Sequence, residues 1–184
     1  LPQLPPLGSN TRHEGAGLTA GQEVLAAGTQ MTARAMALAA SAGIDRVCVR
    51  RQVRVALLTT GDEVRPAGSA LSAGQINDVN TPMLSALLTQ HGAQLVMQEH
   101  VADTLAAHMA ALTTALAHAD LIITSGGVSV GEEDHMRAAV QAMGARVTVP
   151  SVALKPGKPV TLGHIGDACW IGLPGNPMSA FVTF

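Results

Sequence analysis

Residues 53–63 read Val-Arg-Val-Ala-Leu-Leu-Thr-Thr-Gly-Asp-Glu and decide the fold of this chain. The run over 53–59, rich in apolar and β-branched residues, predicts a buried strand, and the glycine and acidic residues after it predict a loop. The same order of strand, loop and helix recurs between residues 80 and 143. Because such alternation builds a mostly parallel sheet covered on both faces, we expect an α/β three-layer sandwich.

Apolar periodicity and capping residues give the extent of the other elements. Helices are predicted over 32–42, 81–91, 103–119 and 133–143. Asn80 and Asp103 are the predicted N-caps of the second and third helices. Further strands are predicted over 94–101, 121–124, 146–149, 160–163 and 168–172. A hairpin turn at 164–167 should make one edge of the sheet antiparallel.

The chain is expected to divide near residue 50. Three prolines and frequent glycines predict that residues 1–50 form turns and short strands with one short helix, the remnant of a preceding β-rich domain. Residues 51–184 form the predicted α/β domain. We expect that domain to be truncated at its C-terminal end, because Phe184 lies inside an apolar segment.

Composition excludes several classes of function. A net charge of −2 gives no positive field that would attract nucleic acid or an anionic membrane surface. Aromatic residues make up 2% of the chain, which leaves almost no rings on which bases could stack. The apolar stretches are far shorter than the roughly 20 residues that cross a bilayer. The two distant cysteines indicate no zinc site, so we expect a cytoplasmic protein with reduced thiols.

Carboxylates gather where the predicted strands end. Glu63, Asp103 and Asp134 follow three different strands, and the carboxyl ends of parallel strands share one edge of a sheet. Each has an ordinary alternative role: a solvated loop residue, a helix cap, and a residue that favours a helix N-terminus. Together, in a chain that is only 13% charged, they indicate a divalent-ion site, and their hard oxygen ligands suit Mg²⁺.

Three loops rich in glycine or proline are candidate ligand-binding segments. Residues 125–129, Ser-Gly-Gly-Val-Ser, match no nucleotide-binding fingerprint, but their N–H groups and hydroxyls suit a phosphate; a tight turn is the alternative. Residues 155–159, Lys-Pro-Gly-Lys-Pro, hold two ammonium groups on a stiff loop, which suits either a bound anion or a solvated turn. Residues 172–177, Gly-Leu-Pro-Gly-Asn-Pro, either cradle a ligand or turn the chain.

Neither histidine nor serine chemistry is indicated. The seven histidines are scattered and lack metal-binding spacing, so roles on the surface or in the core are the better interpretation. Ser125 and Ser129 lack the glycine pattern of a nucleophile elbow, which disfavours nucleophilic serine chemistry.

Five motifs of the chain match one family in order and spacing: residues 60–63, 74–80, 125–134, 155–159 and 172–177. With these motifs the chain resembles the molybdopterin molybdenumtransferases, or MoeA family, which includes the gephyrin E domain. Residues 8–15 and 27–29 resemble the stretch that precedes the catalytic domain in that family. The resemblance therefore covers nearly the whole chain.

The resemblance implies a molybdopterin-binding domain like those of MoaB and MogA, and the final step of molybdenum cofactor synthesis. In that step molybdate is inserted into adenylylated molybdopterin and AMP is released, in a Mg²⁺-dependent reaction. By this correspondence Glu63, Asp103 and Asp134 are the catalytic residues and hold the Mg²⁺. The implied substrate-binding residues are Thr60, Gly61, Asp62, Ser125, Gly126, Gly127, Val128, Ser129, Lys155, Gly157, Lys158, Pro174, Gly175, Asn176 and Pro177.

The resemblance also implies partner proteins, and it shows one position where this chain differs from many members of the family. Members of the family are longer at both ends and share the active site across a homodimer, so this piece alone is expected to bind weakly or to be inactive. A transient contact with molybdopterin adenylyltransferase is also expected. Position 151 is Ser where many relatives carry a basic residue, so one contact with the oxyanion should be weaker.

Three other functions are alternatives, and the sequence argues against each. An enzyme like molybdopterin adenylyltransferase would share the α/β domain, but it usually has a Gly-Gly-Thr-Gly loop where residues 126–129 read Gly-Gly-Val-Ser. The same loop and residues 172–177 disfavour a competence-damage-type nucleotide hydrolase. A non-catalytic scaffold could keep the fold for binding alone, and the intact acidic residues argue against it.

Overall fold

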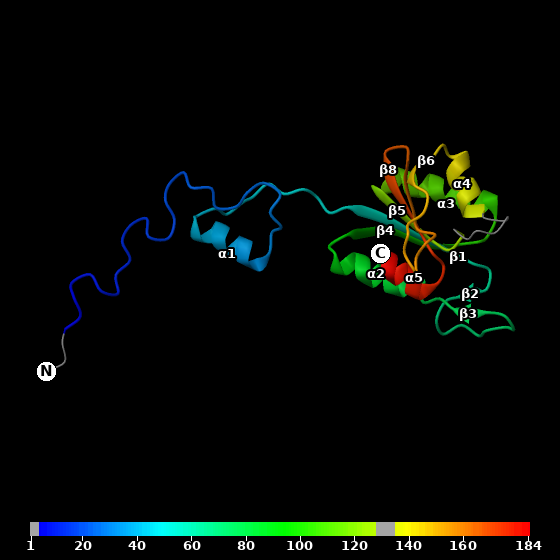
Figure 1. Ribbon diagram of the computed structural model, residues 1–184, viewed down its shortest axis with the longest axis horizontal. Coiled ribbons are helices and arrows are strands. Elements are labelled where there is room, and N and C mark those ends of the chain that lie inside the picture. The colour runs from blue at the N-terminus through cyan, green and yellow to red at the C-terminus, as the bar shows by residue number, and fades with distance from the viewer. Residues whose placement is uncertain (1–3, 128–134) are drawn as a thin grey trace. The chain divides into compact units, whose positions relative to one another are not determined.

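The computed structural model describes residues 4–127 and 135–184 (Figure 1). The chain separates into two compact units, Leu1–Arg50 and Arg51–Phe184. The division falls where the glycine-rich first part of the sequence gives way to the alternating second part. All strands of the described residues belong to the second unit.

The first unit contains one helix, α1 (Ala33–Ser41). Its N-cap is Thr32, and Gly43, with a φ of 78°, follows its C-terminal end, so the helix predicted over 32–42 is confirmed. Among residues 4–50, α1 is the only helix or strand, and the expected β-rich segment is not found there. Glycines with positive φ recur every six or seven residues from position 8 to position 28, and each interrupts the extended backbone that a strand needs.

The second unit is built on a six-stranded sheet in the order β4-β1-β5-β8-β7-β6. Its strands are β1 (Arg54–Thr60), β4 (Gln94–Val101), β5 (Leu121–Ser125), β6 (Arg146–Val149), β7 (Thr161–Ile165) and β8 (Ala168–Leu173). β4, β1, β5 and β8 are parallel, and β7 runs antiparallel to both of its neighbours. The expected sheet, mostly parallel with an antiparallel pairing toward one edge, is confirmed.

Helices cover both faces of this sheet (Figure 1). They are α2 (Asn80–Gln90), α3 (Leu105–His118), α4 (His135–Ala142) and α5 (Pro177–Thr183). α3 and α4 share one core with Leu58 and Trp170, and α2 and α5 share the other with Leu57 and Leu173. Leu57 and Leu58 enter different cores because strand side chains alternate, and each full burial stabilises the fold by roughly 2 kcal/mol.

Two predicted helix caps are wrong, and both corrections bear on the site. α2 begins at Asn80 itself, and Asp78 Oδ1 accepts a hydrogen bond from the backbone of its first turn (2.9 Å). α3 is capped by Thr104 instead of Asp103, because Thr104 has the extended backbone of an N-cap and its hydroxyl accepts a bond from the first turn. Asn80 and Asp103 are therefore available for other contacts.

The remaining boundaries agree closely with prediction. β4 and β6 lie at 94–101 and 146–149 as expected, and a two-residue turn at 166–167 joins β7 to β8 in a hairpin. The described part of α4 starts at His135, and the two residues predicted before it lie outside the described residues. β2 (Val64–Arg65) and β3 (Ile76–Asn77) form a small parallel pair that the sequence pattern does not predict.

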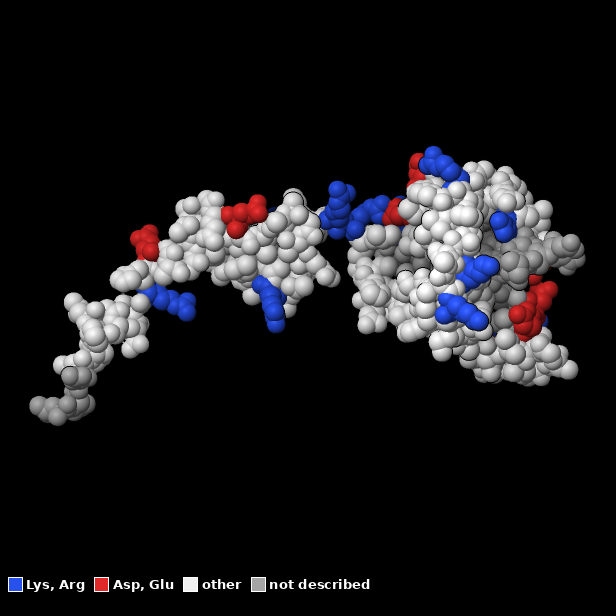
Figure 2. Space-filling model, viewed as in Figure 1, with Lys and Arg blue, Asp and Glu red and all other residues white. Residues whose placement is uncertain are grey.

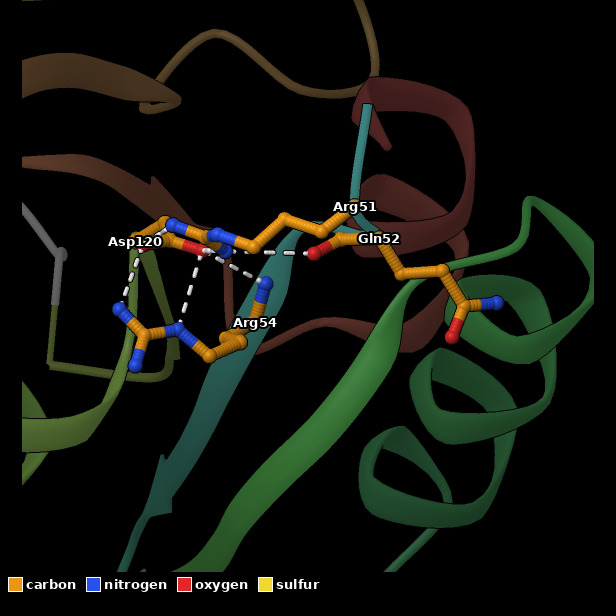
Figure 3. A network of polar contacts seen from close by, with 4 residues as sticks. All are labelled: Arg51, Gln52, Arg54 and Asp120. Carbon is orange, nitrogen blue, oxygen red and sulfur yellow. Dashed lines mark hydrogen bonds and ion pairs between the residues drawn. The ribbon is translucent and has the colours of Figure 1, made fainter. Parts of the chain in front are cut away.

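Two arginines hold one carboxylate at the amino ends of the parallel strands (Figure 3). Asp120, just before β5, accepts hydrogen bonds from Arg51 Nη2 (2.8 Å), from Arg54 Nη2 (2.8 Å) and from the Arg54 N–H (2.9 Å). These bonds hold the pKa of the Asp120 carboxyl far below its usual value. The first residues of the second unit are thereby fixed to β5, at the end of the sheet opposite the predicted loops.

The surface is sparsely charged, as the composition requires. On the face of the second unit seen in Figure 2, basic and acidic side chains lie scattered among uncharged ones. Within residues 4–127 and 135–184, no helix combines the length and the apolar character needed to pass through a bilayer. Cys48 and Cys169 are both exposed free thiols.

Candidate active site

The carboxyl ends of four parallel strands lie next to one another, as expected. Thr60 of β1 is in register with Val101 of β4, and Ser125 of β5 is in register with Thr59 of β1 and Leu173 of β8. The loops that follow these strands therefore start side by side on one rim of the sheet. The described site residues on this rim lie at 60–63, 103, 125–127 and 174–177.

Three of these loops touch through their backbones. Gly126 has a φ of 91°, and a Cβ on it would lie 2.6 Å from the carbonyl oxygen of Thr60. A Cβ on Gly175 would lie 3.4 Å from the Cα of Gly126. We call Thr60, Gly126 and Gly175 the glycine crossing. Only glycine fits at position 126, so the loops approach each other more closely than side chains would allow.

Asn80 ties two of these loops together from the first turn of α2. Its amide nitrogen donates to Ser125 Oγ (2.9 Å) and to the carbonyl oxygen of Gly175 (2.7 Å). The Ser125 hydroxyl is buried and donates in turn to the carbonyl oxygen of Pro174 (3.2 Å). Ser125, a predicted ligand donor, thus fixes the loops to each other in this structure.

The structure places Asp62 and Asp103 side by side. The Asp103 N–H donates to Asp62 Oδ1 (3.5 Å), and the Asp103 side chain is 35% exposed. Asp103 Oδ1 is buried and has no hydrogen-bond partner among the described residues. The carboxylate of Asp103 therefore keeps one oxygen inside the protein, without a partner, while the side chain still reaches solvent.

Glu63 belongs to the turn between β1 and β2 and is exposed. Its carboxylate lies over Gly61, because a Cβ on Gly61 would be 3.0 Å from Glu63 Oε2. Gly61 has a φ of 139°, a conformation that other residues rarely adopt. Because Gly61 has no side chain, the Glu63 carboxylate can occupy the space next to it.

His108 lies behind both Thr60 and Asp103. It is fully buried on α3, and its Nε2 lies 3.1 Å from Thr60 Oγ1 and 4.0 Å from Asp103 Oδ1. Burial lowers the pKa of His108, and the nearby Asp103 carboxylate partly opposes that shift. His108 is a core histidine, one of the two roles predicted for the histidines, but it also contacts the predicted site.

The lysine loop packs against α5. Gly157 is buried with a φ of 118°, and a Cβ on it would collide with Cγ2 of Thr183. Lys155 and Lys158 are exposed on either side of this contact. Among the described residues neither lysine has an ion-pair partner, so both ammonium groups face solvent and its anions.

The loop at 174–177 leads directly into α5. Asn176 is the N-cap of that helix, and its Oδ1 accepts hydrogen bonds from the N–H groups of Met178 (3.0 Å) and Ser179 (3.3 Å). Pro177 follows as the first helical residue, where its missing N–H is no disadvantage. The cap therefore fixes the position of the loop at 174–177, which contributes Gly175 to the glycine crossing.

Part of the predicted metal site falls on residues without a description. Val128, Ser129 and Asp134 lie outside the described residues. Within 4–127 and 135–184, no group of three or more His, Cys, Asp or Glu side chains lies close enough to hold a metal ion. The set of Glu63, Asp103 and Asp134 stays a prediction.

The family profile described as "Probable molybdopterin binding domain" matches residues 56–184. The chain belongs to this molybdopterin-binding domain family. The matched residues include the glycine crossing, both described acidic residues of the predicted metal site, and the lysine loop.

Two relatives extend the likeness of this molybdopterin-binding domain into the first unit. The chain is 41% identical over 182 residues to "Molybdopterin molybdenumtransferase" of Haemophilus influenzae, covering 99% of this chain and 45% of that protein. It is 38% identical over 183 residues to the protein of the same name from Nostoc sp., covering 98% and 42%. The chain thus spans about half the length of the curated relatives it matches.

A solved structure supports the fold of the molybdopterin-binding domain. The molybdopterin biosynthesis MoeA protein from Pyrococcus horikoshii matches with a TM-score of 0.78 and 29% sequence identity. The match covers 92% of this chain and 42% of that one. The predicted fold class is therefore confirmed by architecture and by likeness.

Sequence reasoning missed two residues of the molybdopterin-binding domain, Asn80 and His108. The signal for Asn80 is Asp78, since a second capping residue two positions earlier frees Asn80 for another role. The signal for His108 is its position on the same helix face as Leu112 and Ala115, both buried, five residues after an acidic candidate.

Proposed function

We propose that this molybdopterin-binding domain is the catalytic part of a molybdopterin molybdenumtransferase. The reaction inserts molybdate into adenylylated molybdopterin and releases AMP, as the last step of molybdenum cofactor synthesis. The names of the relatives from Haemophilus influenzae and Nostoc sp. support the activity. The observation that carries the proposal is Asp103, a partly exposed carboxylate with an unpaired inner oxygen, on the same rim as the glycine crossing.

Each part of the rim suits one part of the substrate. The closely packed glycine loops would let the pterin and phosphate groups approach the backbone, whose N–H groups suit anionic oxygens. Lys155 and Lys158 carry positive charges that would neutralise molybdate or phosphate oxygens. We assign electrostatic stabilisation to these residues, since charge develops on the phosphate as the anhydride breaks.

The carboxylates fit a Mg²⁺ ion by the chemistry of their donors. Mg²⁺ prefers oxygen ligands and usually takes only one or two carboxylates, completing its shell with water and substrate phosphates. Asp103, with Glu63 and Asp134, would hold the ion, and the bound ion would supply charge stabilisation to the phosphate. The unpaired inner oxygen of Asp103 supports this assignment, because a carboxylate already satisfied by the protein would be a poorer ligand.

A homodimer, a transient contact with molybdopterin adenylyltransferase and a cytoplasmic location belong to the same proposal. The relatives are about twice as long as this chain, so partner contacts can involve parts of the protein beyond it. Sedimentation equilibrium of the complete gene product tests the dimer: a single species of monomer mass at micromolar concentration would contradict it.

The test of the activity uses the complete gene product with adenylylated molybdopterin, molybdate and Mg²⁺, and measures AMP release. We expect Asp103→Asn to lower turnover at least roughly 100-fold, because the charge that faces the phosphate is lost. Asp167→Asn is the matched control, an exposed aspartate in the β7–β8 turn, and should keep turnover within twofold. Wild-type protein that releases no AMP, or Asp103→Asn protein with normal turnover, would contradict the proposal.

A further inference from the structure

We propose that His108 is a positioning residue that holds Asp103 and Thr60 from behind and so sets the direction in which the Asp103 carboxylate faces the rim. The inference rests on the proposed function, in which Asp103 acts on the cation and the phosphate. It assigns a role to a side chain that sequence motifs do not single out.

One ring nitrogen of His108 lies next to two parts of the site. Nε2 is at hydrogen-bond distance from Thr60 Oγ1 (3.1 Å) and is 4.0 Å from Asp103 Oδ1. Thr60 is a member of the glycine crossing, where its carbonyl oxygen faces Gly126. His108 therefore contacts the crossing on one side and the acidic residue on the other.

The position of His108 in its helix would suit an apolar residue better. α3 buries Ala111, Leu112 and Ala115 against the sheet, and His108 lies one turn before them in the same buried face, with no exposed surface. Burying an imidazole costs free energy that a leucine would not, unless its polar atoms have partners. Nε2 is at hydrogen-bond distance from Thr60 and faces the site, whereas Nδ1 is buried without a hydrogen-bond partner among the described residues. Packing alone therefore does not explain why a histidine stands here.

The inner oxygen of Asp103 lies near His108, whose Nε2 is 4.0 Å away, longer than a hydrogen bond. Asp103 Oδ1 is buried and accepts no hydrogen bond from a described residue. An N–H on Nε2 that donates to Thr60 Oγ1 (3.1 Å) would also present its dipole to Asp103 Oδ1 (4.0 Å). This attraction would keep that oxygen inward and leave the second oxygen directed outward.

The first test examines the contact between His108 and Asp103 in the complete gene product without ligand. ¹⁵N NMR of the imidazole reports which ring nitrogen carries the proton, and we expect that nitrogen to be Nε2. The Asp103→Asn variant should shift the His108 ring signals, and Asp167→Asn should leave them unchanged. His108 signals that do not respond to Asp103→Asn would overturn the proposal, whatever the enzyme's activity.

The second test measures cation affinity with Mn²⁺ alone, by electron paramagnetic resonance. His108→Leu should weaken Mn²⁺ binding roughly tenfold or more, the range seen when a residue behind a ligand is lost. His108→Gln should restore most of the affinity, because its amide N–H can replace Nε2–H. His118→Leu, on the exposed last turn of the same helix, should bind like wild type.

The two tests separate the two proposals. If wild-type protein binds no Mn²⁺ while the His108 signals respond to Asp103→Asn, the positioning contact stands and the cation role in the proposed function is wrong. If wild-type protein binds Mn²⁺ and His108→Leu binds it equally well, or His108→Gln is no better than His108→Leu, the positioning role is wrong. The single tryptophan, Trp170, is buried, and its fluorescence verifies that each variant is folded.

Discussion

The carbonyl oxygen of Thr60 lies 2.6 Å from the point that a Cβ on Gly126 would occupy. No side chain can be placed there without moving one of the two loops, since real Cβ atoms do not come this close to an oxygen. The loop after β1 and the loop after β5 can therefore lie in contact only because residue 126 has no side chain. This contact brings the acidic residues after β1 next to the glycines after β5.

The contact predicts a large effect of Gly126→Ala. An alanine at this position is strained by the φ of 91° and its Cβ clashes with Thr60. We therefore expect a loss of about 3 kcal/mol or more in the free energy of unfolding. Gly92→Ala is the matched control, because Gly92 has a φ of 75° and open space around it. It should lose only about 1 kcal/mol. Urea unfolding followed by Trp170 fluorescence measures both, and equal losses would show that the contact is unimportant.

Asn80→Ala should loosen the loops after β5 and β8. The variant removes two hydrogen bonds, to Ser125 and Gly175, and leaves the carbonyl of Gly175 without this donor. We expect a loss of about 2 kcal/mol in the free energy of unfolding. Asn77→Ala, at an exposed position of β3, should change it by less than about 0.5 kcal/mol. A loss no larger than that of Asn77→Ala would show that the hydrogen bonds of Asn80 do not stabilise the fold.

Gly157→Ala should destabilise the lysine loop by a collision with Thr183, and the collision can be relieved. Thr183→Ser removes the Cγ2 atom that meets the new Cβ. We therefore expect the double variant to recover part of the stability that Gly157→Ala loses, with the strain of a φ of 118° left over. A double-mutant cycle from urea unfolding measures the coupling, and strictly additive losses would contradict the packing of this loop on α5.

The Asp120 carboxylate predicts a pH-dependent contribution to stability. Arg51 and Arg54 lower the pKa of Asp120 in the folded protein, so the folded state favours the charged form. The contribution is present above the ordinary carboxyl pKa of about 4 and is lost as the pH falls below it. Asp120→Asn should lower the urea midpoint at pH 7, and the difference from wild type should shrink between about pH 4 and pH 2.

The control for that prediction is Asp45→Asn. Asp45 pairs with Arg46 at 4.0 Å, and both side chains are more than 90% exposed, so the pair contributes little. The urea midpoint of this variant should follow wild type at every pH. An Asp120→Asn midpoint that also follows wild type would show that the two arginines do not stabilise the folded state through this carboxylate.

Local patterns were sufficient to predict the sheet. β4 and β6 have the predicted bounds, because alternating or β-branched runs end there at glycine, proline or acidic residues. The shared rim followed from parallel topology, which places every βα loop at the same end of the sheet. The short strands expected in the first unit are not found among residues 4–50, where glycines with positive φ recur.

The site could be predicted as a set of loops but not as a set of contacts. Sequence cannot choose between neighbouring capping residues, so Asp103 was assigned a bond that Thr104 makes, and Asn80 one that Asp78 makes. The sequence places His108 on the buried face of its helix but does not show that it meets Thr60 of β1 there. The contacts of Asn80 with Ser125 and of His108 with Thr60 join residues that are more than 40 positions apart and depend on tertiary packing.

The central claim is that the rim formed by β4, β1, β5 and β8 binds the pyrophosphate end of adenylylated molybdopterin. The most direct measurement is a ¹H–¹⁵N NMR titration of this chain with that ligand, which also detects weak binding. We expect the largest amide shifts at Thr60, Asp103 and Gly126. No shift at these residues, or the largest shifts at Arg54 and Asp120 on the opposite end of the sheet, would contradict the claim.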